Sequence, residues 1–289
     1  MKKDAPDEQG MILVNVLLFV AIASGILLLM ISAEDNGLER SLRMRDAARA
    51  QAIARGGEMS AIVALRRDAI VAPDNDNRGE PWASLSEAAA PIEGGTFDLA
   101  ITDAQSAFNI NALITGDAAA VEMLGRIAAS AGIPEQDVPR AVALVRSMGP
   151  VSDLRPLRMS GLAPEQIARL SGLITALPYM GKINLNAAGE PLLALLIGDP
   201  VKTTRLVALR NRQRYLTAAD LASLDIAVPP GTGFTSNLFW VRTRVRIGSA
   251  SRQITSLIAR RDGPAGEKSV AVVGRWVGGS APSQAPALR

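Results

Sequence analysis

An uncharged run of 23 residues near the start of the chain, Met11–Ala33, restricts the fold more than any other feature of the sequence. About 20 apolar residues in a helix cross the hydrocarbon core of a bilayer, so this run is long enough to span one. A cleaved secretory signal is the alternative, but its apolar part covers roughly 7–15 residues and ends at a small-residue cleavage site. Here the run is longer, and a charged, helical pattern follows it from Glu34 to Arg49. We therefore predict a retained membrane helix.

The residues on either side of this run predict its orientation. Lys2 and Lys3 precede it, and Glu34 and Asp35 follow it. Basic flanks favour the cytoplasmic side of a membrane, whereas acidic flanks contribute little. The predicted location is a bacterial inner membrane crossed once, with a cytoplasmic N-terminus and the bulk of the chain in the periplasm.

The composition excludes several kinds of active site. The 289 residues contain no Cys and no His, which rules out disulfides, thiol nucleophiles, zinc ribbons and imidazole bases. The carboxylates of Asp74, Asp76 and Asp103 are the closest approach to an acidic cluster. We predict no catalytic residue and no enzymatic activity.

The segment Asp74-Asn75-Asp76-Asn77 resembles the first positions of an EF-hand calcium loop. The glycine and the distant glutamate that such a loop needs are misplaced, because Arg78-Gly79-Glu80 comes next. A solvated loop that ends a helix is therefore the preferred interpretation. No cofactor is predicted with certainty, Ca²⁺ is left open, and no metal ligand is assigned.

Beyond the apolar run, residues 34–70 lack proline and carry apolar side chains mostly three, four or seven positions apart. This spacing predicts an amphipathic helix that docks on a globular domain, and the segment Pro73-Asp-Asn-Asp-Asn77 predicts its end. Residues 11–70 as one helix would be roughly 90 Å long. Two separate helices are the alternative, and Gly56-Gly57 are expected to bend or weaken the helix.

Alternating apolar and polar residues predict strands at 96–102, 239–247, 252–260 and 269–276, in an antiparallel sheet that packs on the amphipathic helix. The long helical stretch between the first strand and the others predicts an insert with a core of its own. The fold class is therefore α+β, with a large all-α insert in a small antiparallel sheet. The predicted organisation is a leader at 1–10, a membrane helix at 11–33, the rest of this helix with the first strand at 34–103, the insert at 104–238, the remaining strands at 239–277 and a flexible tail at 278–289.

One short pattern occurs twice in the insert. Phe108-Asn109-Ile110-Asn111-Ala112 recurs as Ile183-Asn184-Leu185-Asn186-Ala187, 75 residues later. An Asn side chain accepts hydrogen bonds from free N–H groups at a helix start or holds a turn. A structural role for the four asparagines is therefore the preferred interpretation. We call these two segments the Asn words.

The start of the chain resembles that of type IV prepilins and type II secretion pseudopilins, which have a short charged leader, a Gly before an apolar run, and a helix that continues past the membrane. The resemblance implies cleavage between Gly10 and Met11 by a prepilin peptidase and methylation of the new N-terminus. Most members of this class carry Glu at the fifth position after the cut, where this chain has Asn15. A charge in a membrane helix costs about 2.5–3.5 kcal/mol unless it finds a partner. Since the first subunit of a filament has no predecessor to pair with, Asn15 points to a subunit at the tip. The alternative is that Asn15 is only a tolerated polar residue.

The leader, Asn15, the insert and the Asn words together resemble the general secretion pathway protein K family, the large minor pseudopilin of type II secretion. The resemblance covers nearly the whole chain from Gly10 to about Arg260. It implies a complex with two smaller minor pseudopilins that caps the pseudopilus and helps to start its assembly. The implied partners also include the major pseudopilin, the prepilin peptidase and inner-membrane lipid.

Two other functions remain open. The second Asn word and the helices after it also resemble helix-hairpin-helix modules of DNA-binding or DNA-uptake proteins. Those modules hold phosphate with a Gly-x-Gly hairpin, whereas Leu196-Ile-Gly-Asp-Pro200 has one Gly, an acidic side chain and a proline. A nucleic-acid partner is therefore not expected. The other alternative is a minor pilin of a type IV pilus.

The C-terminal part of the chain is strongly basic. Residues 239–289 carry nine Lys or Arg and two acidic residues, against a formal charge of +3 for the whole chain. A basic strand face is able to meet an acidic partner, a membrane surface or nucleic acid. We interpret it as a solvated face that contacts neighbouring pseudopilins.

Overall fold

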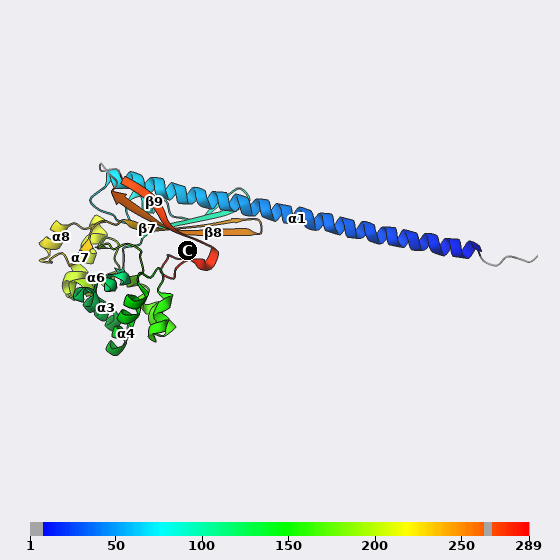
Figure 1. The fold of residues 1–289 in the computed structure, drawn as a ribbon. Helices are drawn as coiled ribbons and strands as arrows, with labels where there is room; N and C mark the ends of the chain where they lie inside the picture. Colours follow the sequence, from blue (N-terminus) through cyan, green and yellow to red (C-terminus); the bar gives the residue numbers. More distant parts are fainter. Residues whose placement is uncertain (1–7, 263–267, 289) are drawn as a thin grey trace, which may run out of the picture.

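The computed structural model describes residues 8–262 and 268–288. One helix, α1 (Glu8–Val71), begins within the predicted leader and runs without interruption to the predicted end. At 1.5 Å per residue it is about 96 Å long. Figure 1 shows its N-terminal half projecting away from a body into which only its C-terminal half is packed. The prediction of one long helix is confirmed, and the alternative of two helices is wrong.

The body contains a five-stranded antiparallel sheet in the order β1-β2-β7-β8-β9. All four predicted strands are present, extended by one or two residues at their ends. The strands are β1 (Glu87–Ile92), β2 (Gly95–Asp103), β7 (Leu238–Ile247), β8 (Ala250–Asp262) and β9 (Lys268–Val277). A short helix, α2 (Pro81–Ser84), links α1 to β1.

The edge strand β1 has no counterpart in the sequence prediction. Its sequence, Glu-Ala-Ala-Ala-Pro-Ile, lacks the β-branched and aromatic residues that mark strands, and Pro91 is acceptable only because the strand lies at an edge. The pairing with β2 shifts between Glu87 and Ala90, and Ala89 has a positive φ of 49° there. The strand β1 thus forms because it pairs with β2, and not because its own residues favour a strand.

The C-terminal half of α1 lies across one face of this sheet. Leu65 and Ala61 pack against Phe239, Val241 and other buried side chains of the sheet, and nearer the projecting half Ala50 and Ala54 pack against Val245. Alternate residues of β7 point to this interface, which is the period-2 pattern that predicted the strand. Small residues on α1 allow the helix axis to approach the sheet closely.

Gly57 lies where this approach is closest, and its neighbour Gly56 does not. A Cβ atom at Gly57 would lie 2.8 Å from Phe97 Cζ and 2.9 Å from Thr243 Cγ2, whereas one at Gly56 would meet nothing within 4 Å. The two glycines that we expected to bend or weaken the helix lie within one unbroken helix. Gly57 instead leaves room for the sheet.

We expect Gly57→Ala to destabilise the protein by about 1–2 kcal/mol, because overpacking outweighs the gain in helix propensity. Gly56→Ala is the matched control and is expected to stabilise it by about 0.5–1 kcal/mol, because Ala is the better helix former. Denaturant titration of the full chain in detergent, followed by tryptophan fluorescence, measures both variants. Equal effects of the two substitutions would contradict the assigned packing.

The insert lies between β2 and β7 and packs around its own hydrophobic cluster, which includes Leu113, Ile127, Leu154 and Leu193. Its helices cover the positions where the sequence predicts a helical pattern. Two short parallel strand pairs, β3–β4 and β5–β6, are present besides the predicted helices. Its elements are β3 (Phe108–Asn109), η1 (Ile110–Thr115), α3 (Ala118–Ser130), η2 (Glu135–Asp137), α4 (Val138–Met148), η3 (Arg155–Ser160), α5 (Pro164–Leu170), β4 (Ile174–Thr175), β5 (Ile183–Asn184), α6 (Glu190–Ile197), α7 (Pro200–Gln213), α8 (Ala218–Ser223) and β6 (Thr232–Gly233). In Figure 1 the insert lies beneath the sheet, toward the end where α1 finishes.

The C-terminal segment, predicted as a flexible tail, contacts the insert. It begins with a short helical turn, η5 (Gly278–Ser280), and continues along the face of the sheet opposite α1. Ala285 is buried, and Gln284 Nε2 donates to the carbonyls of Ser152 at 2.9 Å and Ala176 at 3.1 Å. These contacts give the segment a fixed position in the structure.

Candidate functional site: the exposed apolar helix and the junction behind it

The projecting half of α1 presents a large apolar surface. Every residue from 13 to 45 is exposed, and Phe19 and Leu29 have exposed fractions of 72% and 73%. In the described part of the chain, α1 is the helix that is long and apolar enough to cross a membrane. Such a surface needs lipid or other apolar helices around it. This observation agrees with the predicted membrane segment.

Asn15 lies within this surface and is exposed. All residues from 13 to 45 of α1 are exposed, so the body does not cover Asn15. Gly10 and Met11 lie in the first turns of α1, but their side chains lie outside the described part of the structure, as do leader residues 1–7 altogether. Cleavage at Gly10, methylation of Met11 and a tip-specific role of Asn15 stay predictions.

A buried arginine joins the end of α1 to the sheet and the insert. Arg260 on β8 is 7% exposed. Its guanidinium donates to Asp68 Oδ2 of α1 at 2.9 Å, to Asp76 Oδ1 of the following loop, and to the carbonyl of Ser236 at 2.7 Å. It also lies over the ring of Phe239, 4.6 Å from the ring centre. We call this the Arg260 junction.

Asn184, in the second Asn word, extends the junction into the insert. Its amide Nδ2 donates to the carbonyl of Asp76 at 2.9 Å and to Asp103 Oδ2 at 2.7 Å, and it contacts Ser236 Oγ at 3.1 Å. Burial raises the pKa of Asp103 to about 6, although the hydrogen bonds from Ser236 and Asn184 act in the opposite direction. The junction therefore fixes the insert relative to the membrane-spanning helix.

All four asparagines of the Asn words are buried and hydrogen-bonded, and the two words act alike. The first Asn of each word accepts from the N–H of the second, at 3.2 Å for Asn109 and 2.9 Å for Asn184. The second Asn clamps a distant backbone segment in both directions. Val151 N–H donates to Asn111 Oδ1 at 2.9 Å, and Asn111 Nδ2 returns a bond to Val151 O at 2.8 Å.

Asn186 makes the corresponding pair with Leu216, whose N–H donates to Asn186 Oδ1 at 2.6 Å and whose carbonyl accepts from Asn186 Nδ2 at 3.3 Å. Each word also begins with a short strand that pairs in parallel with a later one, β3 with β4 and β5 with β6. The insert is thus built from two similarly organised halves. These contacts agree with the structural interpretation of the words.

Asp68, Asp76 and Glu80 are buried and close enough for one oxygen of each to lie within 4.8 Å of the others. Ca²⁺ takes six to eight oxygen ligands. Here a guanidinium already lies against Asp68 and Asp76, and Glu80 accepts from Trp82 Nε1 at 2.7 Å. This cluster therefore fits an ion-pair network and not a calcium site, and calcium elsewhere in the chain stays an open prediction.

Glu80 has no cationic hydrogen-bond partner in the described structure. Besides Trp82, its donors are the backbone N–H and the side-chain amide of Asn77, both at 3.1 Å. Burial raises the pKa of Glu80 from 4.5 to about 7, more than these hydrogen bonds lower it. The folded state therefore holds a proton on Glu80 at pH values where the unfolded chain has lost it.

The expected consequence is a loss of stability as the pH rises from about 4.5 to about 7, on the order of 2 kcal/mol from this side chain. Because a glutamine resembles the protonated form, Glu80→Gln should flatten this part of the pH profile and be more stable than the wild type at pH 8. Denaturant titrations between pH 4 and pH 8 measure the slope. The exposed Glu165→Gln serves as control and should keep the wild-type slope. A Glu80→Gln profile parallel to that of the wild type would refute the assignment.

The basic residues of the predicted strand face occupy the side of the sheet opposite α1. Arg244 donates to Gln253 Oε1 at 3.2 and 2.9 Å, and Arg242 Nε donates to Thr255 Oγ1 at 2.9 Å. Arg246 pairs with Asp98 at 3.3 Å. Desolvation, together with the charge of Arg244, lowers the pKa of Arg242. Arg242, Arg244 and Arg246 therefore lie on one face of the sheet. Among the described contacts, one of the three, Arg246, pairs with a carboxylate, that of Asp98.

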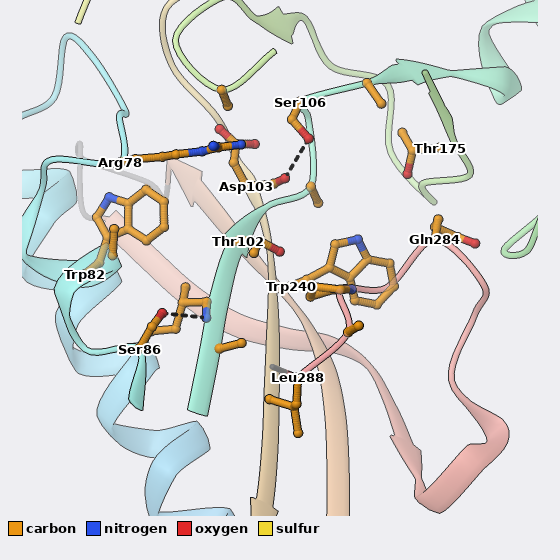
Figure 2. Close-up of a pocket in the computed structure, with 18 of the residues that line it drawn as sticks. Arg78, Trp82, Ser86, Thr102, Asp103, Ser106, Thr175, Trp240, Gln284 and Leu288 are labelled. Carbon is orange, nitrogen blue, oxygen red and sulfur yellow. Dashed lines mark hydrogen bonds between the residues drawn. The ribbon is translucent and has the colours of Figure 1, made fainter. Parts of the chain in front are cut away.

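A cavity of about 680 Å³ lies between the free end of β2, the insert and the tail. Figure 2 shows Arg78, Trp82 and Ser86 on one side, Thr102 and Asp103 at the end of β2, Trp240 between β2 and the tail, and Gln284 and Leu288 of the tail on another side. The Ile101 N–H donates to Ser86 Oγ at 3.3 Å, where β1 no longer covers β2. The residues that line the cavity come from distant parts of the chain, so no sequence pattern could have identified the cavity. Asp103 Oδ2 is already engaged by Asn184 and Ser236, so it is not a free base.

Comparison with known proteins gives one relative over nearly the full length. The chain is 25% identical to type II secretion system protein K of Pseudomonas aeruginosa in an alignment 303 residues long. The alignment covers 89% of this chain and 90% of the relative. No model of a protein family matches the chain. Its fold is similar to that of a chain in the crystal structure of the GspK–GspI–GspJ complex from the type 2 secretion system of enterotoxigenic Escherichia coli. The TM-score is 0.65 at 19% identity, and the match covers 83% of this chain and 100% of the other. Since the sequence match and the fold agree over most of the chain, the resemblance to the general secretion pathway protein K family is confirmed.

Proposed function

We propose that this chain is a minor pseudopilin of type II secretion that caps the tip of the pseudopilus and helps to start its assembly, and thereby supports protein export across the outer membrane. The observation that carries the proposal is Asn15, a neutral residue at the fifth position after the proposed cut, in the half of α1 that the body leaves exposed. A Glu at this position would need a cationic partner from a preceding subunit, because an unpaired charge in a membrane helix is costly. A subunit with Asn needs no predecessor.

The insert supports the same role. It lies toward the end of the body where α1 finishes, away from the apolar half (Figure 1), and the Arg260 junction fixes it there. In a filament held together by parallel apolar helices, this end faces away from the membrane. A broad domain at that end suits a subunit with none above it.

The proposed partners are two smaller minor pseudopilins and the major pseudopilin. The fold of this chain is shared with a chain of a complex of three such components, GspK, GspI and GspJ. The apolar half of α1 supplies a helix-packing surface, and the arginine-bearing face of β7 supplies a charged one. Cutting at Gly10 by a prepilin peptidase would release α1 for assembly. We place the body in the periplasm, with the N-terminus in the cytoplasm and α1 crossing the inner membrane once.

The role is structural in this proposal and not enzymatic, and the relationship to type II secretion protein K favours it over a type IV pilus minor pilin. DNA binding is disfavoured by the hairpin between α6 and α7. Asp199 caps α7, and its carboxylate accepts from Val201 N at 2.9 Å and Lys202 N at 3.0 Å. Those are the N–H groups with which a helix-hairpin-helix module would hold phosphate.

The test locates the chain in assembled filaments. An epitope at the C-terminus, detected by immunogold labelling of pseudopili, is expected at one end of each filament in the wild type. Asn15→Glu is expected to shift part of the label to the shaft, while the matched substitution Asn15→Gln, which is also neutral, leaves it at the end. Label along the shaft of the wild type would refute the proposed tip role. Mass spectrometry of the mature protein checks the processing step, and a chain that begins at Met1 or after Ala33 would contradict it.

A further inference from the structure

A second pocket, of about 520 Å³, lies on the outer side of the insert, where the loop after α1 meets the end of α7. Its volume is within the range of small-molecule sites, roughly 300–1,000 Å³. Three arginines from separate positions line it, and two asparagines and one glutamate complete its polar lining. These residues are Arg78, Arg210, Arg214, Asn186, Asn211 and Glu190.

The positive charges in this pocket are poorly matched by negative ones. The guanidinium groups of Arg214 and of Arg78, which also lines the first cavity, have no hydrogen-bond or ion-pair partner within residues 8–262 and 268–288. Glu190 is the single carboxylate of the lining. Arg210 donates its Nη1 to the carbonyls of Leu185 at 2.9 Å and Ala188 at 2.6 Å, so its position is fixed by the backbone. Burial and the neighbouring charge of Arg78 lower the pKa of Arg210, which agrees with a cluster of like charges.

The end of α7 places the side chain of Arg214 beside the loop after α1. Arg214 caps the C-terminus of α7 in a left-handed conformation with φ of 74°, which a side chain other than Gly or Asn rarely adopts. Its side chain lies over Gly79, where an added Cβ would be 3.3 Å from Arg214 Cδ and 3.0 Å from Asn77 Oδ1. Backbone conformations of this kind are costly and persist where the surrounding structure enforces them. The protein thus keeps an unpaired arginine beside two others.

We propose that the Arg78–Arg210–Arg214 pocket binds an oxyanion, a carboxylate or a phosphate group. Guanidinium groups match both geometrically through paired N–H donors, and a negative group would relieve the repulsion among the three arginines. The amides of Asn186 and Asn211 line the same pocket. The site is separate from the apolar half of α1, so its ligand is held whether or not the chain stands at a filament tip.

The test is isothermal titration calorimetry on the full chain in detergent micelles at constant ionic strength, with sodium phosphate and with a hexaglutamate peptide as probes. The wild type is expected to bind at least one of the two probes with one ligand per chain. The double variant Arg78→Gln/Arg214→Gln should bind it at least tenfold more weakly. Arg210 is left in place because it supports the backbone. Arg212→Gln, on the same helix but not in the pocket, should bind as the wild type does.

The outcomes distinguish the source of the anion. Tighter binding of phosphate indicates a free small anion, and tighter binding of the peptide indicates an acidic protein segment; both uphold the site. If neither probe binds the wild type, or if Arg212→Gln weakens binding as much as the double variant, the proposal is overturned. Circular dichroism and thermal unfolding confirm that each variant is folded, which is expected because Arg78, Arg212 and Arg214 are exposed.

Discussion

Replacing Arg260 by Met is expected to destabilise the protein by about 3–5 kcal/mol, as breaking a buried ion pair on one side does. The variant would leave Asp68 and Asp76, which are 5% and 1% exposed, without a cation. Burial already raises the pKa of Asp68 to about 6 against the opposing effect of Arg260. Without the guanidinium, Asp68 and Asp76 would lose their cationic partner, and the carbonyl of Ser236 would lose its donor.

The comparison that isolates the junction is a set of three further variants. Arg260→Lys keeps the charge but loses the planar fork that reaches two carboxylates and a carbonyl, so we expect an intermediate loss of about 1–3 kcal/mol. Combining Arg260→Met with Asp68→Asn and Asp76→Asn should recover most of the loss, because no uncompensated charge is left. The remote ion pair Arg43–Glu39 is the control, and Arg43→Met should change stability by less than about 0.5 kcal/mol. Denaturant titrations of the full chain supply the values. A loss below 1 kcal/mol for Arg260→Met would show that the junction does not hold the fold together.

The same variants test whether the junction matters for function. Because it joins α1 to the insert through Asp76 and Asn184, its loss should loosen the insert while leaving the apolar half of α1 unchanged. Limited proteolysis is therefore expected to cut Arg260→Met first near the two ends of the insert. Membrane association should stay at the wild-type level.

Parts of the fold that depend on local pattern were predictable from the sequence. The 3.6-residue and two-residue periodicities of residues 34–70 and 239–247 gave one helix and one strand, because in each case a single face is buried against the other element. The Asn words were recognisable as turn-forming because an Asn side chain bonds to backbone two residues away, and such bonds are local. Their distant clamps to Val151 and Leu216 were not predictable.

The remaining features depend on contacts between distant parts of the chain. Arg260 reads in the sequence as one more basic residue of a strand, yet it meets Asp68 and Asp76 from nearly two hundred residues earlier. The strand β1 exists because β2 offers it a partner, and Gly57 differs from Gly56 because Phe97 and Thr243 of the sheet lie against it. The arginine pocket likewise joins the loop after α1 to α7. No periodicity or spacing contains this information.

Introducing two charges into the apolar run, Leu18→Arg with Ile22→Arg, is expected to abolish stable membrane insertion. Each Arg near the centre of a membrane helix costs about 2.5–3.5 kcal/mol on insertion scales. Both positions are exposed, at 56% and 51%, and lie on the projecting half of α1. The body should therefore fold as in the wild type. Alkaline extraction of membranes, with the chain detected in pellet and supernatant, measures the change.

The matched control is Met44→Arg, on the same helix but beyond the uncharged run, with an exposed fraction of 68%. It should stay in the membrane pellet, because its position is expected to lie in water. Retention of the double variant in the pellet would mean that the run is covered by other protein helices and not by lipid. Lipid and a filament core act differently on Asn15 as well. Lipid tolerates a neutral amide near a helix end. A filament core favours a neutral side chain in a subunit that has no preceding subunit to pair with a charge. Loss of insertion by the double variant, with unchanged insertion of Asn15→Glu, would therefore show that Asn15 acts at assembly and not at insertion.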